Sequence, residues 1–424
     1  MKTTFLMLLL LCSAFTVQAQ TPATKSENLR VYLDCQAFCD KDYIKREISF
    51  VDYVNDRFQS TVYVLVTAQE TGSGGREYKL QFEGQGKFEG MRDTRTYIRQ
   101  ATATDDENRK EAVEKLKLGL LPYLLKTDKA NELVIGFKEG DAAAEIATNP
   151  DEDPWNFWVF NLRTRGYFNG DKNYSSSNLS GGITAGRVTD KLKTNFSLDA
   201  SKNKNRFGEG DEEFTYTNER YSFNNMTVWS LGNHLSAGGY LGASKSDYNN
   251  YELDLSVMPA VEYNFFPYSE SNNKYVGLMY KVGPRYFNYK EETIYSQTSE
   301  LRFQESLSLD VSLNQKWGQI SGSTSYSHYF HDFSKKRLSF SGFGDVRLVK
   351  GLSFNVGGYY AIQHDQLNIV KGEVSGEDLL TRRRQLNSNY DFYVNFGIRY
   401  RFGSLFNNVV NPRFEGGGGS FFFF

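Results

Sequence analysis

The feature of this chain that most restricts its fold is a long alternation of apolar and polar residues in its C-terminal two thirds. In the clearest case, apolar or aromatic residues occupy every second position from Tyr390 to Phe402, with polar, charged or small residues between them. The same period of two recurs from Tyr251 to Phe265 and from Leu352 to Ile362. Successive side chains of a β-strand point to opposite faces, so this pattern predicts strands with one apolar and one polar face.

These strands are longer than the strands of ordinary soluble sheets, which run about six residues. They run ten residues or more, and aromatic residues lie at the ends of the apolar face. An apolar-out, polar-in alternation of this length, with aromatic ends, is typical of a transmembrane barrel. We therefore predict an antiparallel transmembrane β-barrel of about 12 strands over residues 155–403. The expected strands lie near residues 157–168, 178–188, 191–201, 219–230, 234–245, 250–266, 274–289, 300–314, 318–330, 337–348, 352–363 and 389–402.

The connections between these strands alternate in length. Val188–Lys191 and Val349–Gly351 are tight, whereas Lys202–Asn218 and Asp365–Leu386 are long and polar. In outer-membrane barrels short turns face the periplasm and long loops face the exterior. An even number of strands then returns both chain ends to the periplasm.

Composition excludes three other classes of protein. A mean hydropathy of −0.54 excludes a polytopic helical membrane protein. A net charge of −2 lacks the excess of positive charge that binds nucleic acid, so no nucleic acid is expected as a partner. An aromatic content of 15% excludes a disordered chain.

The first 19 residues have the pattern of a secretory signal peptide. Lys2 gives a positive start, Phe5–Phe15 is an apolar segment too short to span a bilayer, and Val17–Ala19 is a small-residue cleavage site. The mature chain is therefore expected to begin near Gln20, in the cell envelope.

Residues 27–140 have the periodicity of a periplasmic α/β domain, and residues 141–154 form a charged linker. Asp40 can cap a helix with apolar residues from Ile44 to Val54, and Thr104 with Glu107 forms a capping box before a second helix. Gly72–Gly75 joins two strands, so it is a hairpin turn and not a phosphate-binding loop. The expected order is β-α-β-β-β-α-β, with strands at residues 29–33, 61–67, 77–82, 95–99 and 131–138.

This element order, with the hairpin from Val62 to Phe82, resembles the small periplasmic α/β domains of the curli secretion channel protein CsgG, the penicillin-binding-protein activator LpoB and the N-terminal part of TolB. The resemblance covers about 110 residues. It implies a domain that binds proteins or assembles into oligomers and that carries no catalytic residue.

Cys35 and Cys39 are the two cysteines of the mature chain. In an oxidising compartment this spacing predicts a small disulfide loop. Metal binding would need more ligands, and no histidine lies near, so no metal or cofactor is expected.

One spacing in the barrel matches an enzyme. His234 and Ser236 lie two residues apart, as do the histidine and serine of the twelve-stranded outer-membrane phospholipase. They lie in a predicted periplasmic turn, however, whereas that family acts at the outer rim. We therefore expect no catalytic residue.

Charged residues recur on the predicted inward faces of the strands. They form either a salt-bridged core that fills a narrow barrel or, in the alternative, a channel in which the basic members select anions. The inward charges are Arg163, Arg165, Glu262, Lys281, Asp310, Asp345, Arg347, Arg399 and Arg401.

The last strand ends in an aromatic residue, Phe402, as the signal for barrel assembly does, but the chain continues as a Gly/Phe-rich tail over residues 404–424. Exposed aromatic residues on a glycine linker favour docking to a partner or to the N-terminal domain. The alternatives are an anchor at the membrane interface and a terminus without a specific role. The partner-binding candidates are Phe414, Phe421, Phe422, Phe423 and Phe424.

The functional expectation is a non-enzymatic outer-membrane β-barrel that serves as an anchor or scaffold. Its periplasmic domain and tail recruit an envelope partner, and outer-membrane lipid surrounds the barrel. The alternative is a narrow channel for small, anionic solutes.

Overall fold

The computed structural model describes residues 28–71, 74–134, 154–208, 213–349, 351–373, 384–404, 406, 408–410 and 413. The predicted signal peptide, most of the predicted linker and the five phenylalanines Phe414 and Phe421–Phe424 lie outside these residues. Among the described residues, no helix is long and apolar enough to cross a membrane.

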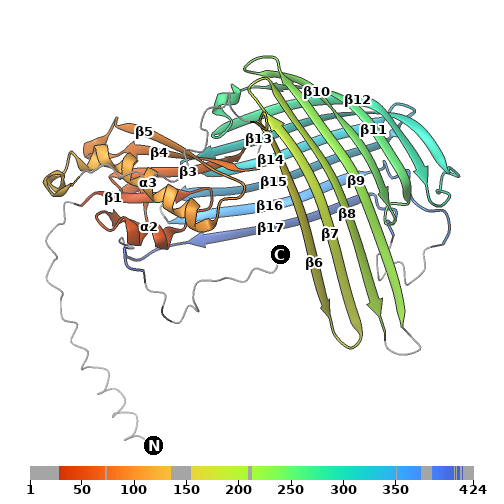
Figure 1. Cartoon of the computed structure of the whole chain (residues 1–424), viewed down its shortest axis with the longest axis horizontal. Helices are drawn as coiled ribbons and strands as arrows, with labels where there is room; N and C mark the ends of the chain where they lie inside the picture. The colour runs from red at the N-terminus through yellow and green to blue at the C-terminus, as the bar shows by residue number, and fades with distance from the viewer. Residues whose placement is uncertain are drawn as a thin grey trace, which may run out of the picture.

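The N-terminal region folds into a five-stranded sheet of order β2-β1-β3-β4-β5 (Figure 1). Strand β1 pairs in parallel with β2 and β3, and the remaining pairs are antiparallel. We call this part the α/β domain. Its strands are β1 (Arg30–Cys35), β2 (Asp52–Tyr53), β3 (Val62–Glu70), β4 (Arg76–Gly84) and β5 (Arg92–Arg99), and its helices are α2 (Lys41–Glu47), α3 (Asp105–Leu124) and the 3-10 turns η1 (Arg57–Gln59), η2 (Gly86–Phe88) and η3 (Asp128–Glu132).

Helix α3 begins with the predicted capping box, in which Thr104 and Glu107 each bond to the other's backbone. It packs over β4 and β5, and Gly119 allows the closest approach. A Cβ atom at Gly119 would lie 2.1 Å from the ring of Phe82, so only glycine fits there without movement. The helices cover one face of the sheet, where apolar residues form the core. This core includes Val31, Leu33, Val62, Val64, Val66, Leu80, Phe82, Leu116 and Leu120.

The other face of the domain sheet is also covered. In β3 the residues between the core positions, Tyr63, Leu65 and Thr67, are buried as well. A strand with both faces buried is expected to be a continuous apolar run, as β3 is. The covering on this second face comes from the C-terminal sheet.

Two predictions for the domain were wrong in part. The first helix ends at Glu47, not near Val54, because Asp52 and Tyr53 instead form β2 against β1. The buried residues Ile48 and Val51 therefore lie in the connection. The described part of the expected strand 131–138 includes the end of η3 and no strand.

The C-terminal region forms a 12-stranded antiparallel sheet in which each strand pairs with its neighbours in sequence. The predicted number and antiparallel order of strands are confirmed. The strands are β6 (Trp158–Gly170), β7 (Tyr174–Val188), β8 (Leu192–Phe207), β9 (Phe214–Ser230), β10 (Leu235–Ser246), β11 (Tyr251–Asn264), β12 (Lys274–Tyr289), β13 (Ser299–Gln315), β14 (Gly318–Tyr329), β15 (Asp332–Val349), β16 (Leu352–Gln363) and β17 (Tyr390–Tyr400).

In this sheet the apolar residues are the more exposed ones and the polar residues that alternate with them are the less exposed ones. In β11 the apolar residues Leu255, Val257 and Val261 are exposed, whereas Asp254 and Ser256, which point to the other face, are half-buried. A sheet that folds in water would show the reverse. One face of the sheet is thus an exposed apolar surface, and we call the opposite face the polar face.

Two features of the sheet differ from the predictions. Strands β8 and β9 run on to Phe207 and from Phe214, so most of the expected loop 202–218 is a strand extension. The described sheet is also open, since β6 and β17 are its two edges and do not pair with each other. Alternation specifies which face a residue occupies, but it does not specify which strand an edge strand pairs with.

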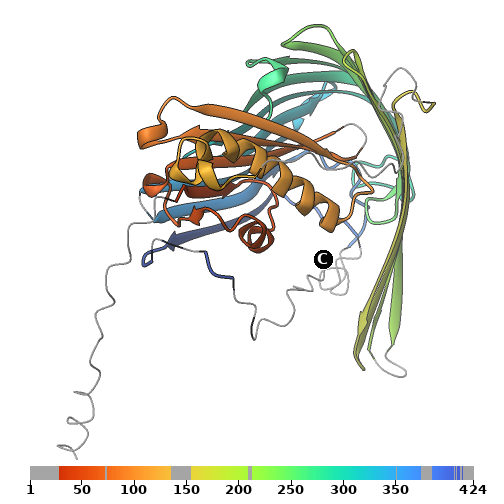
Figure 2. The ribbon, with the colours of Figure 1, turned by 60° about the vertical axis from the view of Figure 1, so that its left-hand side comes forward.

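The sheet is strongly twisted, and β6–β9 turn away from β13–β17 (Figure 1). The α/β domain lies on the concave side of the sheet, against the ends of β13–β17 (Figure 2). This is the end that carries the tight turns after β7, β13 and β15.

Candidate binding cleft between the domain and the sheet

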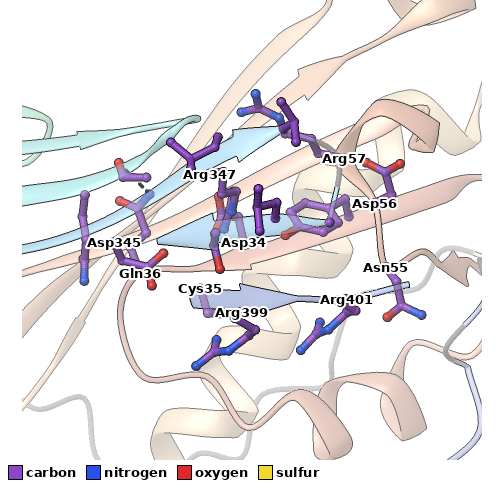
Figure 3. Close-up of a pocket in the computed structure, with 18 of the residues that line it drawn as sticks. Asp34, Cys35, Gln36, Asn55, Asp56, Arg57, Asp345, Arg347, Arg399 and Arg401 are labelled. Atoms are coloured by element: carbon purple, nitrogen blue, oxygen red, sulfur yellow. Dashed lines mark hydrogen bonds and ion pairs between the residues drawn. The ribbon is translucent and has the colours of Figure 1, made fainter. Parts of the chain in front are cut away.

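A cavity of about 350 Å³ lies where the α/β domain meets the sheet (Figure 3). The domain contributes β1, the start of α2 and the segment Asn55–Phe58, and the sheet contributes the polar-face ends of β14–β17. We call this cavity the junction cleft. Its charged lining residues are Asp34, Lys41, Asp56, Arg57, Asp345, Arg347, Arg399 and Arg401.

A bidentate ion pair joins the two sides of the cleft. Both guanidinium NH2 groups of Arg347 on β15 donate to the carboxylate of Asp34 on β1. Asp34 is only 3% exposed, and its carboxylate also accepts a hydrogen bond from Tyr63. The guanidinium of Arg347 lies 5.5 Å from the ring centre of Tyr32. The pairing stabilises the buried carboxylate of Asp34. Removal of Arg347 would leave that charge buried and unpaired, at a large cost in free energy.

Further contacts surround this pair. The Gln36 amide donates to the backbone carbonyl of Gln315 at 2.8 Å. The tight turn after β13 is held from two sides, because Arg57 donates to the carbonyl of Lys316 and the Lys316 ammonium pairs with Glu83. These contacts attach the domain, through the end of β1, η1 and β4, to the end of the sheet that carries the turn after β13.

The segment after β17 lies along the edge of the domain sheet that is formed by β2. Phe406 forms an antiparallel bridge with Val54. The Asn408 side chain accepts a hydrogen bond from the Tyr53 backbone at 2.6 Å and donates to Asp52 at 2.9 Å. The described start of the tail thus extends the domain sheet next to β2.

Arg399 and Arg401 project side by side from β17 beside the cleft (Figure 3). Within the described part of the chain, neither guanidinium has an ion pair or a hydrogen bond. Across the cleft, desolvation lowers the pKa of Lys41 below its ordinary value, and Arg401 and Arg347 lower it further while Asp34 opposes them. This side of the cleft therefore has an excess of positive charge.

The other predicted inward residues lie on the polar face along the sheet. Arg163 pairs with Asp199 on β8. Glu262 accepts a hydrogen bond of 3.0 Å from Tyr268, and the Lys281 ammonium lies 5.0 Å from the ring centre of Tyr240. Asp310 lies opposite Gly277 and Ser323, and Arg165 lies opposite Ser180. A polar hollow of about 550 Å³ is lined by Arg163, Arg165, Ser180, Asp199, Ser201, Arg220 and Ser222, among others.

The connection from β16 to β17 covers the far end of the polar face. Leu367 is buried against Phe287, Tyr289 and Tyr329, and Asn368 bonds to the backbone after β10. The sequence predicted only a long polar loop here. The structure instead folds its first ten residues, 364–373, over the sheet.

Two other candidate sites are the cysteine pair of the domain and the His234–Ser236 spacing of the sheet. The structure has a disulfide between Cys35 and Cys39. His234 and Ser236 bond to different partners, since His234 Nδ1 lies 2.7 Å from the Asn264 carbonyl and Ser236 donates to Tyr268. In the described residues, no group of three or more His, Cys, Asp or Glu side chains could hold a metal ion.

The sequence placed Arg347, Arg399, Arg401 and Asp345 on the inward face, but it did not place them against the domain. Asp34, the partner of Arg347, was missed. The available signal was the unbroken apolar run Val62–Val66, which indicates a strand covered on both sides and hence a second layer over the domain sheet.

Comparison with known proteins gives only distant similarity. No protein-family model and no curated protein sequence matches the chain. Among solved structures, the chain is similar to the NanC porin in a rhombohedral crystal form, with 9% identity over 57% of this chain and 100% of that chain, at a TM-score of 0.28. It is also similar to the translocator domain of the autotransporter NalP from Neisseria meningitidis, with 13% identity over 58% of this chain and 82% of that chain, at a TM-score of 0.18. These similarities are too low to carry a functional inference.

Proposed function

We propose that the chain is a non-enzymatic outer-membrane β-barrel that holds its α/β domain at the periplasmic mouth of the barrel. In this proposal β6 and β17 come together to close the sheet, the exposed apolar face meets lipid and the polar face lines the interior. The domain then serves as a fixed docking platform for an envelope partner, as the resemblance to periplasmic protein-binding domains implies.

The observation that carries this proposal is the inverted exposure of the 12-stranded sheet. Apolar residues such as Val257 (48% exposed) point outward along strands of 11 to 18 residues. Such a surface is unfavourable in water and favourable in a bilayer. The domain is attached at the end opposite the long connections 290–298 and 364–389. This supports a periplasmic position, because the long loops of barrels of this class face the exterior.

The membrane part of the proposal can be tested with two neighbouring cysteine variants. Val257→Cys and Ser256→Cys lie on opposite faces of β11 and differ by one position. Each is labelled with a small fluorophore, and the full-length protein is reconstituted with brominated phospholipid. We expect strong quenching at position 257 and little at position 256. Equal quenching at both positions would rule out a lipid-facing apolar surface.

The platform part is tested by mild-detergent purification of the tagged full-length protein with crosslinking and mass spectrometry. The expected result is a stoichiometric envelope protein crosslinked to the α/β domain. Recovery of the chain alone, under conditions that preserve the quenching difference above, would reject the platform while leaving the barrel in place.

The second candidate function is a narrow channel for anionic solutes. The observation that favours it is the polar hollow, which has an excess of positive charge. Its lining includes three cationic side chains, Arg163, Arg165 and Arg220, and one carboxylate, Asp199. The domain would then close the mouth of the channel. In planar bilayers, Asp34→Asn should raise the conductance above that of the wild type, and Arg165→Gln should reduce anion preference. No conductance in either the wild type or Asp34→Asn would exclude the channel.

A further inference from the structure

The junction cleft has an uneven distribution of charge. Its carboxylates lie toward Arg347 and the segment Asn55–Phe58, and Asp34 is already used by Arg347 and Tyr63. Arg399, Arg401 and Lys41 line the cleft from the end of β17 and the start of α2, where Lys41 interacts electrostatically with Asp34 as well as with Arg401. In the described part of the chain no side chain neutralises these two guanidinium groups, and both residues are exposed, so an anion from solution can reach them.

The arrangement of this group suits a phosphate. Arg399 lies on β17 and Arg401 directly follows its last residue, where the Arg401 N–H still donates to the Gly351 carbonyl. In an extended backbone, residues two apart have Cα atoms about 6.6 Å apart and side chains on one face. A guanidinium offers a planar pair of donors that matches two oxygens of a phosphate, and a lysine adds a point charge. Lys41 comes from the domain, so an anion in the cleft would contact the domain and the sheet together.

The depth of the site points to the membrane surface. The residues that alternate with the two arginines, Ile398, Tyr400 and Phe402, are 72%, 62% and 82% exposed on the apolar face. Tyrosine and phenylalanine at the end of such a strand mark the level of the lipid headgroups. In the barrel proposed above, the two arginines lie at this level on the inner side of the wall, so a phosphate reaches them from the periplasmic mouth and not through the apolar face.

We propose that Arg399, Arg401 and Lys41 form a phosphate-binding site in the junction cleft, which takes the phosphate of an anionic phospholipid headgroup or of a soluble phosphate ester. This inference rests on the proposed function for the membrane level of the site, and it goes beyond that function because it needs the docked domain but no protein partner. The bound phosphate links the domain to β17 and so stabilises the docked arrangement.

Native mass spectrometry of the full-length protein in a neutral detergent can test this site. The probes are a short-chain phosphatidylglycerol, phosphatidylcholine of the same chain length, and glycerol 3-phosphate. We expect phosphatidylglycerol to bind and the double variant Arg399→Gln/Arg401→Gln to lose affinity about tenfold or more, since it removes the charge-assisted hydrogen bonds of both guanidinium groups. Lys117→Gln/Lys126→Gln, which removes the same charge from the exposed end of α3, should bind as the wild type does.

The outcomes separate the two sources of phosphate. Binding of phosphatidylglycerol but not of glycerol 3-phosphate assigns the site to lipid, and comparable binding of both assigns it to soluble esters. If the double variant does not fold, Lys41→Met serves in its place and should also weaken binding. The proposal is overturned if no phosphate probe binds, if phosphatidylcholine binds equally well, or if folded variants bind like the wild type.

Discussion

At the scale of single residues, Gly119 shows how closely the domain core is packed. The ring of Phe82 occupies the space where any side chain would begin. We expect Gly119→Ala to lower the free energy of unfolding of the domain by about 1–3 kcal/mol, the usual cost of overpacking. The measurement is the urea midpoint of the domain in the full-length protein, followed by pulse proteolysis. Lys117→Ala on the exposed side of the same helix is the control, and an unchanged midpoint for Gly119→Ala would contradict the packing.

Buried tyrosines make the domain sensitive to alkali. Burial raises the pKa of Tyr53 above its ordinary value of 10.0, and it raises that of Tyr123 to about 12. A raised pKa favours the protonated form in the folded state. The stabilising contribution is therefore fully present below pH 10 and is lost as the pH rises from there toward the folded-state pKa.

We expect Tyr53→Phe to make the loss of domain stability above pH 10 less steep, by up to about 1.4 kcal/mol per pH unit. Tyr53 is a suitable position because its hydroxyl makes only a 3.5 Å contact with the Ile44 carbonyl. Urea midpoints at pH 8 to 11 measure the slope. An identical slope in the variant and the wild type would show that Tyr53 ionises equally in both states.

At the scale of elements, the start of α3 is the best-determined boundary in the domain. The Thr104 hydroxyl accepts a hydrogen bond from the Glu107 backbone and satisfies a donor that the helix leaves free. Thr104→Ala should cost about 1 kcal/mol of domain stability. Thr102→Ala, two residues earlier and equally exposed, should cost almost nothing, and a similar effect of both changes would show that the cap is not the cause.

The elements that the sequence predicted well are those defined by local signals. Thr104 and Glu107 form a short motif, and the alternation from Tyr251 to Phe265 gave strand β11 to within two residues at each end. The elements predicted badly depend on distant partners. Asp52 and Tyr53 become a strand only because β1 lies beside them, and their apolar neighbours fit a helical period equally well.

The same distinction applies to the candidate cleft. Alternation placed Arg347, Arg399 and Arg401 on the polar face. It could not place Asp34 against Arg347, because the two residues are 313 positions apart and no local pattern relates them. The position of the tail next to β2 likewise depends on a pairing across the whole chain.

At the scale of the whole molecule, the Asp34–Arg347 pair joins the two parts. Removing one partner leaves the other charge buried and unpaired, which costs about 3 kcal/mol or more. We expect Asp34→Asn and Arg347→Gln each to weaken docking of the domain. The double variant should be far less impaired than the sum of the two changes predicts.

Docking can be measured by an engineered crosslink between Gln69→Cys and Ser271→Cys, whose native side chains lie within 3.2 Å. The crosslinked fraction under mild oxidation reports the docked population. Lys117→Gln serves as a charge control far from the junction. Strict additivity of the two single variants would show that Asp34 and Arg347 act independently.

The contacts at the junction also impose an order on the assembly of the chain. The α/β domain is synthesised first, but the groups that hold it are among the last to appear: Gln315, Arg347, Ser404 and Asn408. The residues of the domain are therefore all synthesised before its docking surface, and the full set of docking contacts needs β15, β17 and the segment beyond them. A chain truncated before its last strand should therefore carry a domain that keeps the Asp34–Arg347 pair but lacks the contacts of Ser404 and Asn408, and that docks less firmly than in the full-length protein.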